Sequence, residues 1–389
     1  MRELWLPQIA TSAIFLANGT AIGVWAAHIP LLKAAHELSE EHLGFVLLGF
    51  AIGAITTMVL TGALTTRYDS GRVTIVAGLA FCGALGLPAV APTAAALFAA
   101  TLLLGGCNGA MDVSMNTDAT RLERVRGSPI MSRFHAFFSL GGLTGAAVSG
   151  LLVQGGLGAR FNMGLTGAAL ALMVLMTAPI LWRSRLRTLE WHSPPRHEPF
   201  PHRHVVWRSR TLRRLGLVAL CAAIAEGAMV DWTGVYLATV LHSPLAFAAA
   251  GFAAFSISMT IGRLTGDRVV ARLGPRRVLV GSGLLAGAGI ALALAAQSPP
   301  VAAAGFGVAG LGLANIVPLA FGAGAQALPA APGIGVASVA TVGYAGFLLG
   351  PPVIGFLAGL IGLRAALAVL IAAGIAVSVL GARLRPDAR

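Results

Sequence analysis

Charged residues are scarce in this chain of 389 residues, since Asp, Glu, Lys and Arg together make up only 11%. Typical globular proteins contain about 25%. A soluble protein so poor in charge could not cover its own surface, and here 57% of the residues are hydrophobic and the mean hydropathy is +0.82. The composition therefore excludes most soluble enzymes and predicts a membrane protein with many spans.

The motifs of common catalytic and metal sites are also missing. The three cysteines lie in apolar stretches without the spacing of a metal site or a disulfide framework, so we expect small core residues: Cys82, Cys107 and Cys221. The chain contains no P-loop and no G-x-S-x-G elbow. We expect no metal, no cofactor and no enzymatic activity. A membrane-embedded enzyme or receptor is disfavoured because no clustered nucleophile set is visible.

Twelve apolar stretches are long enough to cross a bilayer as helices, which takes about 20 residues each. The first is longer than the apolar core of a signal peptide, so we expect it to be retained. The predicted all-α spans are 6–30, 43–66, 73–91, 93–118, 132–154, 160–183, 213–238, 245–266, 277–297, 300–325, 334–358 and 362–383.

The basic residues predict the orientation. With both termini in the cytoplasm, 24 of the 27 Lys and Arg residues fall on the cytoplasmic side, and only Lys33, Arg160 and Arg364 lie outside. This matches the positive-inside rule and accounts for the net charge of +13 without nucleic-acid binding. We expect a multi-pass protein of a bacterial inner membrane.

The one long polar stretch, 184–212, contains six arginines and four histidines. It is either a solvated basic linker beside anionic headgroups, which we favour, or a metal-sensing tract of His192, His197, His202 and His204. It separates two six-helix bundles, 1–183 and 213–389.

The two halves resemble each other. Predicted spans end with GAL at 62–64 in the first half and with GRL at 262–264 in the second, an offset of 200 residues. GAAVSG at 145–150 matches GPPVIG at 350–355 at an offset of 205. Asn108 and Asn315 both have glycine-rich surroundings and are offset by 207 residues. Halves built as repeats around a central site are typical of transporters.

The segment GRLTGDR at 262–268, followed by further arginines, resembles the loop 8–9 signature of the major facilitator superfamily. GALTTRYDSGR at 62–72 resembles its first-half copy, with Thr66 in place of the usual aspartate. FH at 134–135, SLGG at 139–142 and EGAMVDW at 226–232 resemble a poorly characterised bacterial inner-membrane branch. The resemblance implies two pseudo-symmetric six-helix bundles and gating side chains at Asp267, Arg268, Arg272, Arg67 and Arg72.

Ionisable side chains inside spans are functional candidates because burying a charge there costs at least ~2.5–3.5 kcal/mol. Of the fourteen acids, four lie in predicted spans: Asp112, Asp118, Glu226 and Asp231. Glu226 is midway along its span and is the main proton-carrier candidate, with Asp112, Asp231 and His135 as the others. His135 is either part of a proton relay with Asp112 or a static hydrogen-bonding group. Asp118, near a helix end, is expected to cap.

Asn108, Asp112 and Asn116 are spaced i, i+4, i+8, which places them on one helix stripe. That stripe must face protein or a water-filled cavity. Further candidates for contact with a solute are Asn18, Trp25, Trp232, Tyr236 and Asn315. The two aromatics near position 232 are equally well explained by an interfacial belt, and the amides by helix packing.

These features predict a monomeric secondary active transporter that uses alternating access and a proton to move a small polar or amphipathic solute. Uptake of a sugar-like or other metabolite and proton-driven efflux of a drug or metabolite remain open. A passive uniporter or channel is a more distant alternative because conduction of a neutral solute needs no buried acids.

Overall fold

The computed structural model describes residues 5–126, 130–183, 209–328 and 332–384, and the regular structure in these ranges is helical, without β-strands. Twelve helical segments there are long and apolar enough to span a membrane. Each overlaps one predicted span, so the all-helical fold is confirmed. The histidines proposed as a metal-sensing tract lie at positions outside the described residues.

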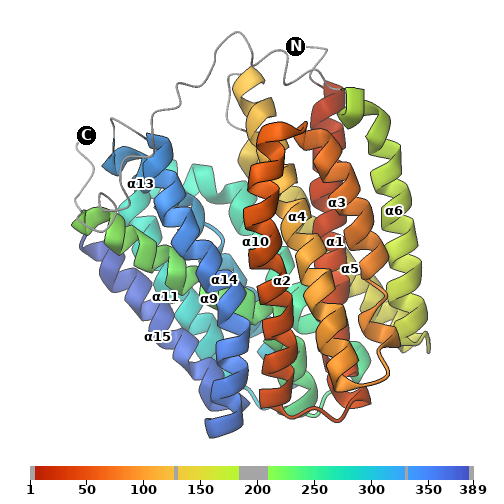
Figure 1. Ribbon diagram of the computed structural model, residues 1–389. Coiled ribbons are helices and arrows are strands. Elements are labelled where there is room, and N and C mark those ends of the chain that lie inside the picture. Colours follow the sequence, from red (N-terminus) through yellow and green to blue (C-terminus); the bar gives the residue numbers. More distant parts are fainter. Residues whose placement is uncertain (1–4, 127–129, 184–208, 329–331, 385–389) are drawn as a thin grey trace. The chain divides into compact units, whose positions relative to one another are not determined.

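The helices form two compact units, of which the first comprises Met1–Pro195 and Pro244–Ala253. In this unit α1 packs against α5, α2 against α4, and α3 against α4 and α6. Figure 1 shows these helices in red to yellow-green. Their bounds are α1 Trp5–Ala35, α2 Glu40–Arg67, α3 Ser70–Ala84 with the 3-10 turn η2 Pro88–Val90, α4 Ala94–Arg126, α5 Met131–Gln154 and α6 Ala159–Arg183.

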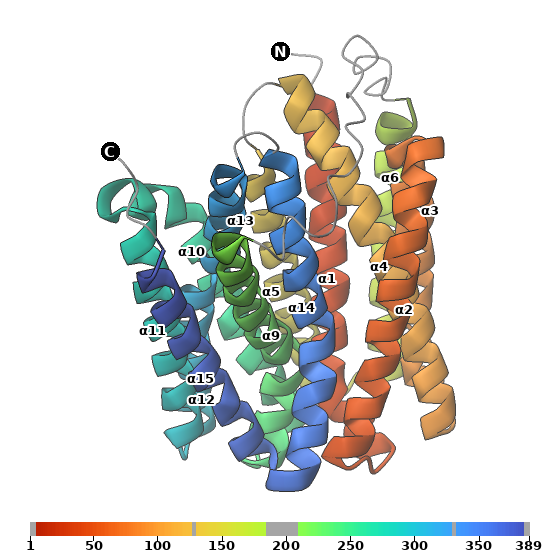
Figure 2. The same ribbon diagram turned by 60° about the vertical axis from the view of Figure 1, so that its left-hand side comes forward.

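The second unit comprises Arg196–Ser243 and Ala254–Arg389. In this unit α9 packs against α14, and α11 packs against both α12 and α15; Figure 2 labels these helices. The bounds are α9 Arg210–Thr239, α10 Leu245–Leu273, α11 Pro275–Ala295, α12 Pro299–Leu313, α13 Ile316–Ala327, α14 Pro332–Ile361 and α15 Leu363–Ala382. The first residues of α10 group with the first unit.

Acidic side chains determine where two helices of the first unit begin. Asp69 Oδ1 accepts the Gly71 N–H at the start of α3 (3.1 Å), and Glu123 accepts the N–H groups of Ile130 (2.7 Å) and Met131 (2.9 Å) before α5. The first N–H groups of a helix have no partner within the helix, so these acids supply acceptors that the backbone lacks.

The tenth span is broken, whereas the sequence predicted a continuous helix over 300–325. Helix α12 ends at Leu313 and α13 begins at Ile316. Pro318 explains the break because it has no N–H to donate to the Ala314 carbonyl four residues earlier, and its ring clashes with that carbonyl. Asn315 therefore lies at a helix junction.

Close helix contacts at glycines show how the two repeats correspond. Gly105 meets the carbonyl of Phe50, and Gly310 meets that of Phe255, so both partners are shifted by 205 residues. Between α1 and α5, and again between α9 and α14, Gly141 contacts Leu16 and Gly346 contacts Leu220, shifts of 205 and 204.

These contacts correct two of the sequence alignments. Gly262 packs against Ala314, whereas Gly62 has no neighbouring atoms where a Cβ would lie, so the 200-residue offset does not describe the packing. Asn108 and Asn315, offset by 207, are not equivalent either, since position 315 corresponds to Ala110 at an offset of 205. An offset of 204–205 residues relates these glycine contacts of the first unit to those of the second.

Candidate functional site

The polar stripe predicted in α4 divides into two hydrogen-bonded pairs in the first unit. Asn18 of α1 donates its Nδ2 to Asn108 Oδ1 at 3.1 Å, and both side chains are buried. One turn further along α4, Asn116 Nδ2 donates to Asp112 Oδ1 at 3.2 Å. Asp112 and Asn116 are half-buried. The structure thus brings one carboxylate and three amides together along α4 and α1.

An aromatic pair lies on the same helix as Asn18. Trp25 of α1 stacks on Phe50 of α2, with ring centroids 6.0 Å apart and an interplanar angle of 12°. The Trp25 side chain is only 3% exposed. Its role in solute contact stays a prediction.

Asp118 has a larger network than the predicted capping role requires. Its side chain is 2% exposed and accepts hydrogen bonds from Ser70 Oγ (2.9 Å) and Thr11 Oγ1 (3.5 Å). Arg121 donates to Ser70 Oγ (2.8 Å) and to the Thr65 carbonyl (3.1 Å). This Asp118 network joins α1, α2, α3 and α4. Sequence reasoning missed Ser70 and Arg121 as partners.

Residues of the first-half signature cap a helix and pack against an aromatic ring. Asp69 caps α3, and the Arg72 guanidinium lies 5.0 Å from the centroid of the Trp182 ring, a cation–π arrangement. Arg67 is exposed at the end of α2 and has an interaction of its own. Asp69, the acid nearest in sequence to Thr66, therefore accepts a hydrogen bond at the N-terminus of α3.

An ion pair lies within the spans of the second unit. Glu226 Oε1 of α9 accepts a hydrogen bond from Arg263 Nη2 of α10 at 3.0 Å. The two side chains are 17% and 12% exposed. Charge-assisted hydrogen bonds are strong, but the cost of desolvating both charged groups offsets much of this gain.

Arg263 corrects the charge count made from the sequence, where it was grouped with loop residues. Helix α10 continues to Leu273, ten residues beyond Arg263, which is about 15 Å of helix at 1.5 Å per residue. The signal was present in the sequence, because no proline interrupts the chain between Arg263 and Pro275. The pairing with Glu226, 37 residues away, had no such signal.

Two aromatics proposed for solute contact also make packing contacts and hydrogen bonds in the second unit. Trp232 and Tyr236 are fully buried. The Trp232 indole N–H donates to the Pro351 carbonyl (2.9 Å), and the Tyr236 hydroxyl donates to the Leu294 carbonyl (3.3 Å). These bonds tie α9 to α14 and α11, and solute contact by either residue stays a prediction. Asp231, one residue earlier, is half-buried and has a partner.

His135 of α5 is half-buried and packs edge-on against Phe15, with ring centroids 5.4 Å apart. Its carbonyl accepts a hydrogen bond from the Ser139 hydroxyl at 3.1 Å. His135 has a further interaction, so a relay and a static role both remain compatible with this geometry.

Asn315 contacts the loop 8–9 signature, and its predicted contact with a solute stays a prediction. From the junction of α12 and α13, its Nδ2 donates to the Gly262 carbonyl at 3.1 Å. Its Oδ1 lies where a Cβ at Gly266 would be, so a larger residue there would force the amide to move. The amide thus holds the broken tenth span against α10.

The gating residues Asp267 and Arg268 are both exposed on α10. Among the described side chains Asp267 makes no ion pair, with Arg268, Arg272 or any other cation. The expected partner is therefore not assigned in this structure, and the gating role stays a prediction.

Two repeats of membrane-spanning helices, with carboxylates, amides and an ion pair held inside the spans, define a polytopic membrane transport protein. The model of the Major Facilitator Superfamily matches residues 11–272 and 235–389. The chain belongs to this superfamily, and it is a transporter and not an enzyme.

Relatives and solved structures agree with this assignment. An uncharacterised MFS-type transporter of Yersinia pestis is 36% identical over 92% of this chain and 91% of its own length. The membrane protein MosC of Rhizobium meliloti is 34% identical over 94% and 86%.

Among solved structures, a D-xylose–proton symporter gives a TM-score of 0.76 at 13% identity, covering 97% of each chain. A variant of the nucleoside transporter NupG gives 0.75 at 15% identity, covering 96% of this chain and 98% of its own. At such identities the likeness shows the fold alone.

Proposed function

We propose that this transporter couples proton movement to transport of a small polar or amphipathic organic solute across a bacterial inner membrane. The observation that carries the proposal is the Glu226–Arg263 ion pair inside the spans of the second unit. Glu226 is the proton carrier, and Arg263 is its counter-ion in the state that the structure represents.

The pair suits coupling because its two members differ in what they can do. A carboxylate can bind and release a proton, whereas a guanidinium stays charged. Protonation of Glu226 removes its negative charge and so weakens its attraction to Arg263. Binding of the proton therefore changes the relative stability of two conformations. A ligand shifts such an equilibrium only by its different affinity for the two states.

The solute contacts that we propose are the polar groups of the first unit: Asn18, Asn108, Asp112 and Asn116. Three amides and a carboxylate offer donors and acceptors to hydroxyl or amine groups of a polar solute. Two of the structural neighbours are named for D-xylose and nucleoside transport, and both solutes carry several hydroxyl groups. We propose uptake of a sugar-like or other polar metabolite, with proton-driven efflux of a drug or metabolite as the alternative.

We further propose that 1–183 and 213–389 form two bundles joined by a cytoplasmic basic linker at 184–212. The protein then works as a monomer with both termini in the cytoplasm. The asymmetry of basic residues supports this orientation.

The experiment begins with a thermal-shift screen of purified protein against sugars, nucleosides, amino acids and antibiotics, since a ligand that binds the folded state stabilises it. Uptake of the best compound is then measured in vesicles with an imposed pH gradient. Glu226→Gln should abolish accumulation while exchange of solute across the membrane persists, because exchange does not require release of the proton.

Asp112→Asn is the matched control, since it removes the competing carboxylate of α4. If Asp112→Asn abolishes accumulation and Glu226→Gln does not, the coupling site is on α4. If both variants accumulate the solute, neither carboxylate carries the proton. Accumulation in the direction opposite to the proton flow would identify an antiporter.

A further inference from the structure

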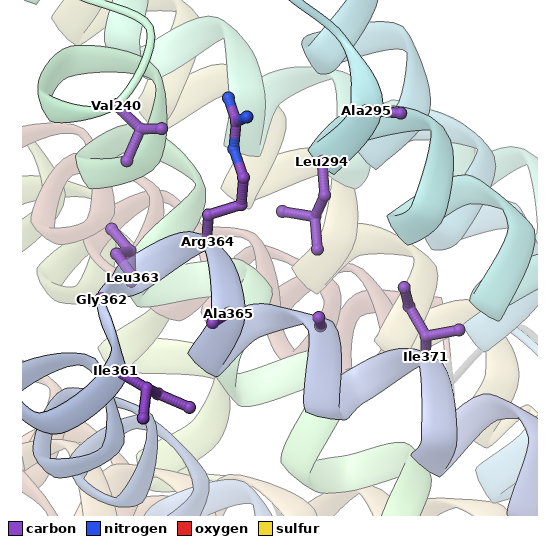
Figure 3. A pocket seen from close by; sticks show the side chains of 10 residues that line it. Val240, Leu294, Ala295, Ile361, Gly362, Leu363, Arg364, Ala365 and Ile371 are labelled. Carbon is purple, nitrogen blue, oxygen red and sulfur yellow. The ribbon is translucent and has the colours of Figure 1, made fainter.

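An apolar groove lies at one end of the second unit, where the ends of α9 and α11 meet the junction of α14 and α15. Its volume is about 650 Å³. The apolar lining includes Val240, Leu294 and Ile371, and among the described residues Arg364 is the only charged one that lines the groove. Figure 3 shows the Arg364 side chain extending between Val240 and Leu294.

The position of the groove along the helices places it at the edge of the hydrocarbon layer. Helix α15 has 20 residues, Leu363–Ala382, and therefore spans about 30 Å, the thickness of that layer. Arg364 is the second residue of this helix. Its guanidinium thus lies at the depth of lipid headgroups, while Ala368 and Ile371 lie deeper, at the depth of acyl chains.

The groove combines a lone cation with room for an apolar chain. Arg364 is exposed and makes no ion pair among the described residues. Ala365 and Ala368 are small and exposed on the same helix, which leaves space beside α15. Ile361, which lines the groove, and its chain neighbour Leu360 are 55% and 82% exposed, as expected for side chains facing lipid.

We propose that this groove binds an anionic phospholipid of the surrounding membrane. Its phosphate contacts Arg364, and one acyl chain lies along the apolar wall past Ala368 toward Ile371. A hydrophilic solute does not fit this lining. A zwitterionic headgroup fits less well because, in the part of the chain that the structure describes, no acid lines the groove to accept its cationic part.

The test measures binding of phosphatidylglycerol and of phosphatidylcholine with the same chains to delipidated protein in detergent, by native mass spectrometry and by thermal unfolding. The wild type should bind phosphatidylglycerol more tightly. Arg364→Gln should weaken this binding about tenfold, the loss expected for one charge-assisted hydrogen bond, and should remove the preference over phosphatidylcholine.

Two further variants separate the contributions. Ala368→Phe fills the groove without changing the charge, so it should also weaken phosphatidylglycerol binding, and it serves if Arg364→Gln does not fold. Arg160→Gln is the matched control: Arg160 is the exposed second residue of α6, 204 residues before Arg364, and does not line this groove. It should bind the lipid as the wild type does.

Three results would overturn the proposal. Equal binding of the two lipids by the wild type would exclude recognition of the anionic headgroup. Unchanged phosphatidylglycerol binding in both Arg364→Gln and Ala368→Phe would place the lipid elsewhere. Competition by inorganic phosphate as strong as that by phosphatidylglycerol would show an anion site without a lipid chain.

Discussion

The energetics of the Glu226–Arg263 pair give the sharpest prediction. At the 3.0 Å separation of Oε1 and Nη2, two unit charges attract by about 5 kcal/mol at an effective dielectric constant near 20. The cost of desolvating both groups offsets much of this attraction. The net value of the pair is therefore small, but removing one partner leaves the desolvation cost of the other without compensation.

Arg263→Met should be the costly change. Glu226 accepts from Arg263 and has no other interaction among the described residues, so its loss leaves a poorly solvated carboxylate alone. We expect a cost of about 3–5 kcal/mol, which lowers the midpoint of thermal unfolding by on the order of 10 °C. Glu226→Gln keeps a neutral acceptor beside Arg263 and should cost only about 1 kcal/mol.

The double variant provides the control. With both changes present no charge is left unpaired, so the double variant should lose less stability than the sum of the two single variants, by roughly 2 kcal/mol. Thermal unfolding of all four proteins in one detergent measures this difference. If Arg263→Met unfolds at the wild-type temperature, the two side chains are not an ion pair in the folded protein, and the coupling mechanism built on them is wrong.

Other predictions test the contacts outside the pair. Gly266→Ala should destabilise the protein by about 1–3 kcal/mol because its Cβ meets the amide of Asn315, and adding Asn315→Ala should recover part of the thermal stability; an unaffected Gly266→Ala would place the amide elsewhere. Asp118→Asn should cost about 1–2 kcal/mol, since a neutral acceptor replaces the charged one for Ser70, and a wild-type melting temperature would contradict the network. Asp267→Asn should slow transport in vesicles with little loss of folded protein, and an unchanged rate would remove it from gating. A cysteine introduced in 184–212 should resist an impermeant thiol reagent in intact cells, and labelling from outside would reverse the orientation.

The spans could be predicted from the sequence because each depends only on local composition. About 20 apolar residues suffice to identify a membrane helix, and each predicted range overlaps a span in the structure. The break at Ala314 was missed although its cause, Pro318, is local. A proline inside an apolar run is tolerated in many membrane helices, so the sequence alone does not say whether the helix kinks or stops.

The partners of the candidate site residues could not be predicted because they lie far apart in the chain. Asn18 and Asn108 were each selected as intramembrane polar residues, but their hydrogen bond joins positions 90 residues apart. Asn315 contacts a carbonyl 53 residues away. A hydropathy pattern indicates how deep in the membrane a residue lies, but not which helix it faces. A role that depends on a partner side chain can therefore be assigned only from the fold.

The two repeats share their packing contacts but not their polar residues. In the register set by the glycine contacts, Glu226 corresponds to Ile22 and Arg263 to Met58, while Asn18 corresponds to Ala222 and Asn108 to Leu313. Since the same helix contacts form in each repeat with apolar residues at these positions, packing does not require the ion pair of the second unit or the amide pair of the first. Polar groups in a membrane are costly, and a cost that the fold does not require is best explained by transport.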